Sequence, residues 1–301
     1  AARRYLEKRG LDKEVVEAFQ LGYAPRGWDN LVDFFSRKKE RPETVEKAGL
    51  IAQRPSGNGY YDRFRDRIVF PIIDAGKQVS GFGGRVMDDS LPKYLNSPET
   101  PVFNKRKSLY GLNLTRAACR EEGAVFIVEG YLDLIALYRH GVENVAATLG
   151  TSLTSDHVKL LKKFVKKAFL VFDGDEAGIK AALRSIPLFR EQDFDTRVIT
   201  LSKGYDPDSF VFEFGGDAFL QEAEKAPGAM AFLTETAVVK HGLSVEGKLA
   251  VLEDMKDPLS GVRDPAARSL YVKELAERLG IDEDAGLESN RMASLKKGKT
   301  I

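Results

Sequence analysis

Short apolar runs alternate with helix-length segments between residues 112 and 214, and this alternation limits the possible folds more than any other feature of the chain. The apolar runs are AVFIV, NVAAT, AFLVF and TRVITL, and the segments between them are YLDLIALYRHG, TSDHVKLLKKF and EAGIKAALRSIPLF. Strands that read as continuous apolar runs are buried on both faces, as in a parallel sheet with helices on each side. We therefore predict a parallel α/β subdomain over residues 112–215.

The residues before this subdomain have a different pattern. Residues 3–50 read as short helices broken by Gly and Pro, and residues 59–86 alternate in polarity around a turn at 74–77. The alternation predicts antiparallel strands. We expect residues 1–111 to form a mixed α/β subdomain, so that the whole chain is of the α/β class, or α+β overall.

The residues after the parallel subdomain show only helical periodicity. This predicts a helical subdomain over residues 216–284. Residues 285–301 are polar and without pattern, which indicates a tail that is disordered or derived from cloning.

Composition excludes several classes of protein. A hydrophobic content of 43% and a charged content of 30% are typical of a soluble globular protein. The one cysteine, Cys119, allows neither a disulfide framework nor a cysteine-based zinc site. There is no run of 18 apolar residues, so we expect no membrane segment and a cytoplasmic location.

Carboxylates follow three of the predicted strands. Glu129 comes directly after AVFIV, Asp173 and Asp175 follow AFLVF, and Asp206 and Asp208 follow TRVITL after a short loop. Ligands bind at the carboxyl ends of parallel strands. If these strands are neighbours, the acids converge at one edge of the sheet, where their repulsion favours binding of divalent cations such as Mg²⁺.

Such a site suits phosphoryl transfer, in which metal ions activate an attacking oxygen and stabilise a leaving one. Gly130, Gly174 and Gly178 fit this interpretation, since they let phosphate or backbone approach closely. Each motif also has a simpler explanation. Glu-Gly is a common turn before a helix, and Asp208 could cap the helix that follows it. Asp-x-Asp after a strand also occurs in haloacid-dehalogenase phosphatases, in which Asp173 would be a nucleophile.

A basic segment precedes the acids. Residues 54–111 contain ten Lys or Arg against six Asp or Glu. We expect three arginines to alternate along one strand face, where they could bind phosphates of DNA, or pair with Asp62 and Asp66 across the strand. A nucleotide or a single strand could be held by a second group of side chains, namely Arg85, Lys93, Tyr94, Asn96 and Lys105. The three alternating arginines are Arg63, Arg65 and Arg67.

Several of these segments carry a family resemblance. EGYLDLIAL, VFDGDEAGIKAA and KGYDPDSFV resemble the Toprim domain that primases, topoisomerases and some nucleases share. The DGDEAG and GYDPDSF versions, the segment TLGTSLTSDHVKLL and the upstream segments DRFRDRIVFPI, GFGGR and PKYLNSPETPVFNKRKSLYGL resemble bacterial replicative primases most closely.

The resemblance implies synthesis of RNA primers on single-stranded DNA from ribonucleoside triphosphates. It implies a Toprim-type central sheet, Mg²⁺ as cofactor with Mn²⁺ as a substitute, and Glu129, Asp173 and Asp175 as catalytic metal ligands. Asp206 and Asp208 would extend the metal site, and Asp133 would orient metal or ribose. Whether Glu129 is a ligand or a general acid or base stays open. Another Toprim enzyme such as a nuclease, a phosphatase and a non-catalytic DNA-binding module are the alternatives.

The resemblance also implies what this chain lacks. With one cysteine it cannot form the zinc-binding domain of such primases, so we expect no zinc. The chain ends soon after the helical segments, so we expect the helicase-binding domain of the full-length protein to be absent. We expect His140, His157 and His241 to be neither ligands nor bases, Cys119 to fill a buried position, and Trp28 to serve packing.

Overall fold

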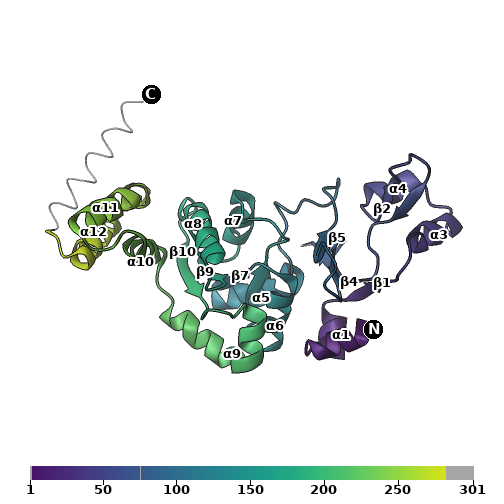
Figure 1. Ribbon diagram of the computed structural model, residues 1–301, viewed down its shortest axis with the longest axis horizontal. Coiled ribbons are helices and arrows are strands. Elements are labelled where there is room, and N and C mark those ends of the chain that lie inside the picture. Colours follow the sequence, from purple (N-terminus) through teal and green to yellow (C-terminus); the bar gives the residue numbers. More distant parts are fainter. Residues whose placement is uncertain (1, 75, 283–301) are drawn as a thin grey trace.

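The computed structural model describes residues 2–74 and 76–282. Figure 1 shows three parts along the long axis: an N-terminal part at one end, a helix-covered sheet in the middle, and a group of helices at the other end. The predicted tail, residues 285–301, lies outside the described residues. In the described part, no helix is long and apolar enough to cross a membrane.

The described residues of the N-terminal part contain the short helices predicted over residues 3–50 and six strands. The helices are α1 (Ala2–Lys8), α2 (Lys13–Ala18), α3 (Asn30–Arg37) and α4 (Pro42–Lys47). The strands are β1 (Gly22–Ala24), β2 (Ile51–Gln53), β3 (Tyr60–Asp62), β4 (Arg67–Ile73), β5 (Val79–Val86) and β6 (Tyr94–Asn96). One antiparallel sheet has the order β1-β4-β5-β6, and β2 pairs with β3 alone.

The predicted turn at 74–77 connects β4 with β5. The Asp74 side chain accepts hydrogen bonds from the backbone N–H groups of Gly76 and Gln78, at 2.8 and 2.9 Å. An aspartate that binds its own following backbone in this way is a common turn signal. The prediction of antiparallel strands around this turn is confirmed.

The predicted strand face of arginines is wrong. Strand β3 ends at Asp62 and β4 begins at Arg67, and the residues between them are irregular. Asp62 does not pair with the arginines through its carboxylate, which instead accepts from the N–H groups of Leu31 and Val32 at the start of α3. The polarity of the segment alternates as in a strand, but strand β3 ends at the buried Asp62. The Asp62 carboxylate accepts hydrogen bonds from N–H groups of the first turn of α3, which have no partner within the helix.

The central part is the predicted parallel sheet. Its strands are β7 (Ala124–Val128), β8 (Val145–Ala147), β9 (Lys167–Phe172) and β10 (Asp195–Thr200), in the order β10-β9-β7-β8. All pairs are parallel. The helices are α5 (Leu112–Glu122), α6 (Tyr131–Arg139), α7 (Ser155–Lys162), α8 (Glu176–Arg190) and α9 (Pro207–Lys225).

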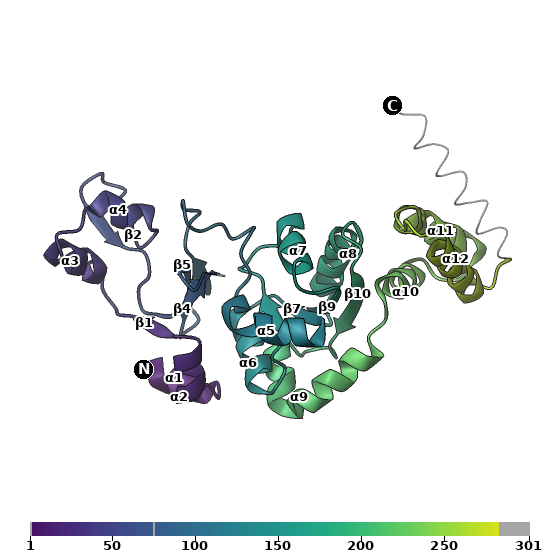
Figure 2. The same cartoon turned by 180° about the vertical axis from the view of Figure 1, so that it is seen from behind.

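Successive residues of the central strands enter two different cores. In β7, Phe126 and Val128 pack with α6, α9 and the N-terminal part, whereas Val125 and Ile127 pack with α5, α7 and α8. Because side chains alternate across a strand, both faces of β7 must be apolar. Figure 2 shows the helices that cover the sheet from the reverse side.

The C-terminal part consists of α10 (Ala229–His241), α11 (Val245–Ser260) and α12 (Pro265–Leu279), which bury a core of their own. The predicted boundary at residue 216 falls within α9, next to a kink at Gly215 (φ 82°, ψ 170°). Beyond the kink, Phe219 and Ala223 still pack in the core of the sheet. The boundary at 216 stays a prediction.

Replacing Gly178 by alanine is expected to destabilise the protein by about 1–3 kcal/mol. An added Cβ would lie 2.2 Å from the carbonyl oxygen of Asp173, so the start of α8 must shift. The free energy of unfolding in urea measures the effect. Gly228→Ala is the control, because nothing lies within 4 Å of its Cβ position and its φ is −62°. An equal loss in both variants would contradict the prediction.

Candidate active site

The strand order places the acidic motifs side by side. Glu129 directly follows β7, Asp173 directly follows β9, and Asp206 follows β10 after a short loop. Strands β10, β9 and β7 are consecutive neighbours and parallel, so their carboxyl ends share one edge. The prediction that the three acidic strand ends are adjacent is confirmed.

A cavity of about 340 Å³ lies at this edge. Acids line one part of it, and cationic, aromatic and amide side chains line another. The acids are Glu129, Asp133, Asp173, Asp206 and Asp208, and the other predicted residues are Arg85, Lys93, Tyr94 and Asn96. Predicted metal-binding and nucleotide-binding residues from the two subdomains therefore face one space.

Helix N-termini fix two acids of the cavity, Asp133 and Asp206, and also the predicted metal ligand Asp175, which does not line the cavity. Asp175 accepts from Gly178 N–H at the start of α8 (2.7 Å), and Asp206 accepts from Ser209 N–H at the start of α9 (2.8 Å). Asp133 accepts from Gly130 N–H in the first turn of α6 (2.9 Å). Exposed N–H groups of a first turn attract carboxylates in this way. The cap of α9 is thus Asp206, and the alternative explanation that Asp208 caps this helix is wrong.

Asp208 instead pairs with Arg9 across 199 residues of sequence, at 2.8 Å. Arg9 lines the cavity, and the sequence pattern gave no indication of this residue. It lies at the end of a short exposed helix, where a lone arginine carries no positional signal. Only the packing of the N-terminal helices against the sheet core brings it there.

Repulsion and burial raise the pKa values of the acids. Loss of solvent and the charges of Asp206, Glu129 and Asp175 raise the pKa of Asp173 to about 6. Burial first, and then Asp206 and Asp208, raise the pKa of Asp133 to about 7. Burial is also the main cause of the raised pKa values of Glu129 and Asp208. The cationic side chains around the cluster therefore do not fully offset the negative charge of its carboxylates.

This charge excess fits a divalent cation, which prefers carboxylate oxygens. Within residues 2–74 and 76–282, however, no group of three or more His, Cys, Asp or Glu is arranged to hold a metal ion. Glu129, Asp173 and Asp175 stay our proposed ligands. Two of the predicted glycines lie against backbone. A Cβ added at Gly174 would be 2.2 Å from the carbonyl oxygen of Leu201, and one added at Gly178 would be 2.2 Å from that of Asp173.

Three of the nucleotide-binding candidates, Arg85, Tyr94 and Asn96, lie on the neighbouring strands β5 and β6. Arg85 is buried and donates to the Tyr94 hydroxyl at 2.6 Å. Asn96 donates to the carbonyl of Leu149 at 2.6 Å and accepts from the Tyr131 hydroxyl at 2.7 Å. These bonds hold the edge of the antiparallel sheet against the parallel one. Lys105 does not line the cavity.

The predicted DNA-binding arginines line a separate cavity of about 310 Å³. Arg65 stacks over the Trp28 ring, with its guanidinium carbon 3.9 Å from the ring centroid. Arg67 is buried and donates to the carbonyl of Pro92 at 2.8 Å, so its guanidinium is engaged within the protein. Trp28 packs against Arg65 and Tyr61, as expected, but it is 55% exposed, so part of its ring also faces solvent.

Replacing Asp133 by asparagine is expected to stabilise the metal-free protein by about 4 kcal/mol at pH 8, and by nothing below about pH 4. The folded-state pKa of Asp133 is raised to about 7, so its favourable contribution is present at low pH and is lost as pH rises through 7. Asparagine can still accept from Gly130 N–H. Urea unfolding of both proteins between pH 4 and 8 measures the difference, and a pH-independent difference would contradict the assignment.

Comparisons with known proteins identify the family. Residues 1–116 match the family model of the DNA primase catalytic core, N-terminal domain, and residues 126–211 match the Toprim-like model. A crystal structure of a DNA primase domain from Pseudomonas aeruginosa is 36% identical, with a TM-score of 0.85, and the match covers 96% of this chain and 92% of that one. The chain belongs to the DNA primase catalytic-core family.

Two further primases extend the comparison. The DNA primase of Clostridium acetobutylicum is 40% identical over 286 residues, which are 94% of this chain and 47% of that protein. A structure of the DnaG primase catalytic domain bound to ssDNA is 37% identical, with a TM-score of 0.83, over 92% of this chain and 90% of that one. The chain spans about half the length of the curated primases that it matches.

Primase membership corrects one expectation. Residues 230–284 match the family model described as the DnaB-helicase binding domain of primase, so the expectation that such a segment is absent is wrong. These residues form α10–α12, and amphipathic spacing shows only that such helices pack. A partner would recognise the exposed residues of these helices, and amphipathic spacing does not show which exposed residues bind a partner.

Proposed function

We propose that this primase-family chain synthesises RNA primers on single-stranded DNA, with ribonucleoside triphosphates as substrates and Mg²⁺ as cofactor. The observation that carries the proposal is the single cavity in which five carboxylates face Arg9, Arg85 and Lys93. Carboxylates suit the metal ions, and the cations suit the phosphates that those ions bind.

In this proposal Glu129, Asp173 and Asp175 would hold the metal, with Asp206 and Asp208 extending the site. The bound metal would supply activation of the attacking 3′-hydroxyl and stabilisation of the leaving pyrophosphate. Arg85 and Lys93 would hold the triphosphate, while Tyr94 and Asn96 would position the nucleotide. The buried Arg85 is held in place by Tyr94, which orients its guanidinium before substrate arrives.

The template strand would lie along the second cavity. Arg63 and Arg65 line it, and the stacked pair of Arg65 and Trp28 offers both a cation and an exposed ring. Single strands are bound by such combinations of charge and stacking. The relative crystallised with ssDNA supports this partner. A primase acts on chromosomal DNA, so the proposal implies a cytoplasmic location.

Incorporation of labelled ribonucleotides on a single-stranded DNA template tests the function. We expect incorporation with Mg²⁺ or Mn²⁺, none with a chelator, and none without template. Phosphate release from small phosphate esters, without incorporation, would favour the phosphatase alternative. Template binding without incorporation would favour a non-catalytic DNA-binding module.

We also propose that α10–α12 contact a replicative helicase. The support is the family match over residues 230–284, together with Val245 and Leu249, which are 71% and 62% exposed and lie four residues apart on one face of α11. Replacing both by serine should weaken co-elution with the helicase, whereas Val102→Ser, another exposed apolar site, should not. Unchanged co-elution would contradict this surface.

A further inference from the structure

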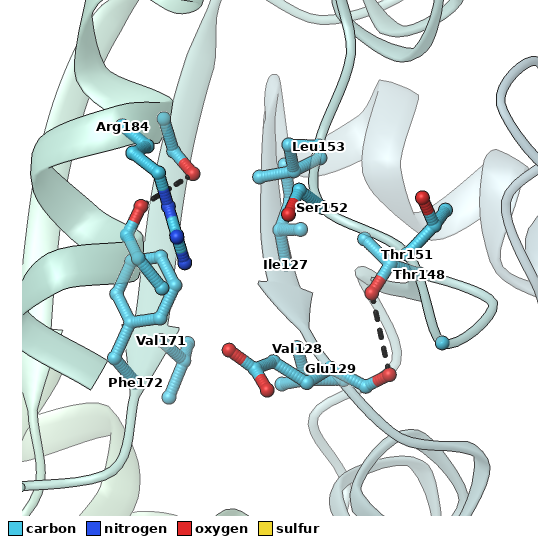
Figure 3. Close-up of a pocket in the computed structure, with 13 residues that line it drawn as sticks. Ile127, Val128, Glu129, Thr148, Thr151, Ser152, Leu153, Val171, Phe172 and Arg184 are labelled. Carbon is cyan, nitrogen blue, oxygen red and sulfur yellow. Dashed lines mark hydrogen bonds between the residues drawn. The ribbon is translucent and has the colours of Figure 1, made fainter. Parts of the chain in front are cut away.

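Another cavity, distinct from the acidic one and from the arginine-lined one, lies on the other side of Glu129. Its volume is about 290 Å³, and it shares Glu129 and Gly150 with the acidic cavity. Figure 3 shows it between α8 and the loop that follows β8, with apolar side chains of β7 and β9 alongside. Apart from Glu129, no residue that lines it has a predicted role, although its walls include part of the segment TLGTSLTSDHVKLL.

Arg184 is the cation of this cavity. It is exposed and makes no hydrogen bond or ion pair with any residue in the described part of the chain. In Figure 3 its side chain extends from α8 toward the carboxylate of Glu129. Ala181, one turn earlier on the same helix face, is small and leaves the guanidinium room. Within the described residues, the charge of Arg184 is therefore offset only at a distance, by its electrostatic interaction with Glu129.

Hydroxyl groups line the opposite wall. Thr151 and Ser152 follow Gly150, whose φ of 65° turns the chain sharply after β8. Their hydroxyls make no hydrogen bond with the described residues. The neighbouring Thr148 hydroxyl donates to the carbonyl of Glu129 at 3.3 Å, which ties this loop to the acidic strand end. The loop thus presents free donors at a fixed position beside Glu129.

We propose that Arg184, Thr151 and Ser152 form an oxyanion subsite that binds a phosphoryl group of the substrate next to Glu129. A guanidinium and hydroxyls donate the hydrogen bonds that phosphate oxygens accept, and the bonds from a guanidinium are strengthened by its charge. The inference rests on the proposed function, in which Glu129 is engaged by a metal ion and no longer offsets the charge of Arg184.

Two phosphoryl groups could occupy the subsite: the diphosphate end of a nucleoside triphosphate or a phosphodiester of the primer strand. The variants that separate them are Arg184→Ala and Arg184→Lys, with Lys180→Ala as control. Lys180 lies on the same helix, is exposed, pairs with Glu176 and does not line the cavity. Two assays are needed: inhibition by inorganic pyrophosphate, and extension of a preformed RNA primer.

If the diphosphate end binds here, Arg184→Ala should raise the KM for nucleotides and weaken pyrophosphate inhibition by about tenfold, since a charged hydrogen bond is lost. If a phosphodiester binds here, the KM for the primer should rise by a similar factor with pyrophosphate inhibition unchanged. In either case Arg184→Lys should restore part of the effect, and Lys180→Ala should have none.

Two results would overturn the subsite. One is unchanged KM values and unchanged pyrophosphate inhibition in Arg184→Ala. The other is a shift in Mg²⁺ dependence alone, which would make Arg184 a residue that positions Glu129. If the wild-type chain incorporates no nucleotide, the proposed function fails but the subsite can still be tested by equilibrium binding of pyrophosphate and of a short oligoribonucleotide. The subsite predicts that Arg184→Ala binds one of these two ligands more weakly than wild type does.

Discussion

Replacing Asp173 by asparagine is expected to lower primer synthesis by about 10³-fold or more, because in the proposed mechanism the loss of a metal ligand removes several kcal/mol of transition-state stabilisation. Asp173 directly follows β9 and interacts electrostatically with Asp206, Glu129 and Asp175. The same change should stabilise the metal-free protein at neutral pH, since it removes one member of a mutually repelling group. Ribonucleotide incorporation and thermal unfolding measure the two effects.

The control for this substitution is Asp217→Asn on α9, an exposed residue that does not line the acidic cavity. It should leave both quantities unchanged. A variant at Asp173 that is active, or that is inactive but less stable than wild type, would contradict the assignment. The first result would remove Asp173 from the metal site, and the second would make it a structural residue.

Replacing Tyr131 by alanine is expected to destabilise the protein by about 3–5 kcal/mol. The ring is 3% exposed and stacks on Phe70 of the N-terminal sheet, with centroids 4.9 Å apart. It also meets Tyr110 edge-on at 4.7 Å. Strand β5 approaches so closely that a Cβ on Gly83 would lie 2.4 Å from the ring. The ring therefore joins the N-terminal part to the parallel sheet, and its loss leaves a cavity at that junction.

Tyr131→Phe separates the ring from its hydroxyl. This variant keeps the packing but removes the hydrogen bond to the side-chain oxygen of Asn96. The free energy of unfolding should therefore fall by about 1–3 kcal/mol. Because Asn96 lines the acidic cavity, the KM for nucleotides should also rise. Urea unfolding of both variants measures the stability. Equal stability of wild type and Tyr131→Ala would show that the junction tolerates repacking.

The sequence predicted the central sheet well, because burial on both faces makes β7 apolar at every position and β9 apolar at every position after Lys167. It predicted the N-terminal strands less well. The alternation from Tyr60 to Arg67 is that of a strand, yet the chain breaks where Asp62 caps α3. The alternation of polarity within a short segment does not predict a hydrogen bond to a helix 30 residues away.

The sequence by itself determined the parallel α/β core, the acids at its strand ends and the family resemblance, since each depends on residue type and short-range spacing. Only the tertiary structure decided the strand order, which makes Glu129, Asp173 and Asp206 neighbours. It also decided that Arg9 faces Asp208 and that Arg184 faces a cavity beside Glu129. These pairings join residues far apart in the chain, and packing of the two cores, which local periodicity does not encode, sets them.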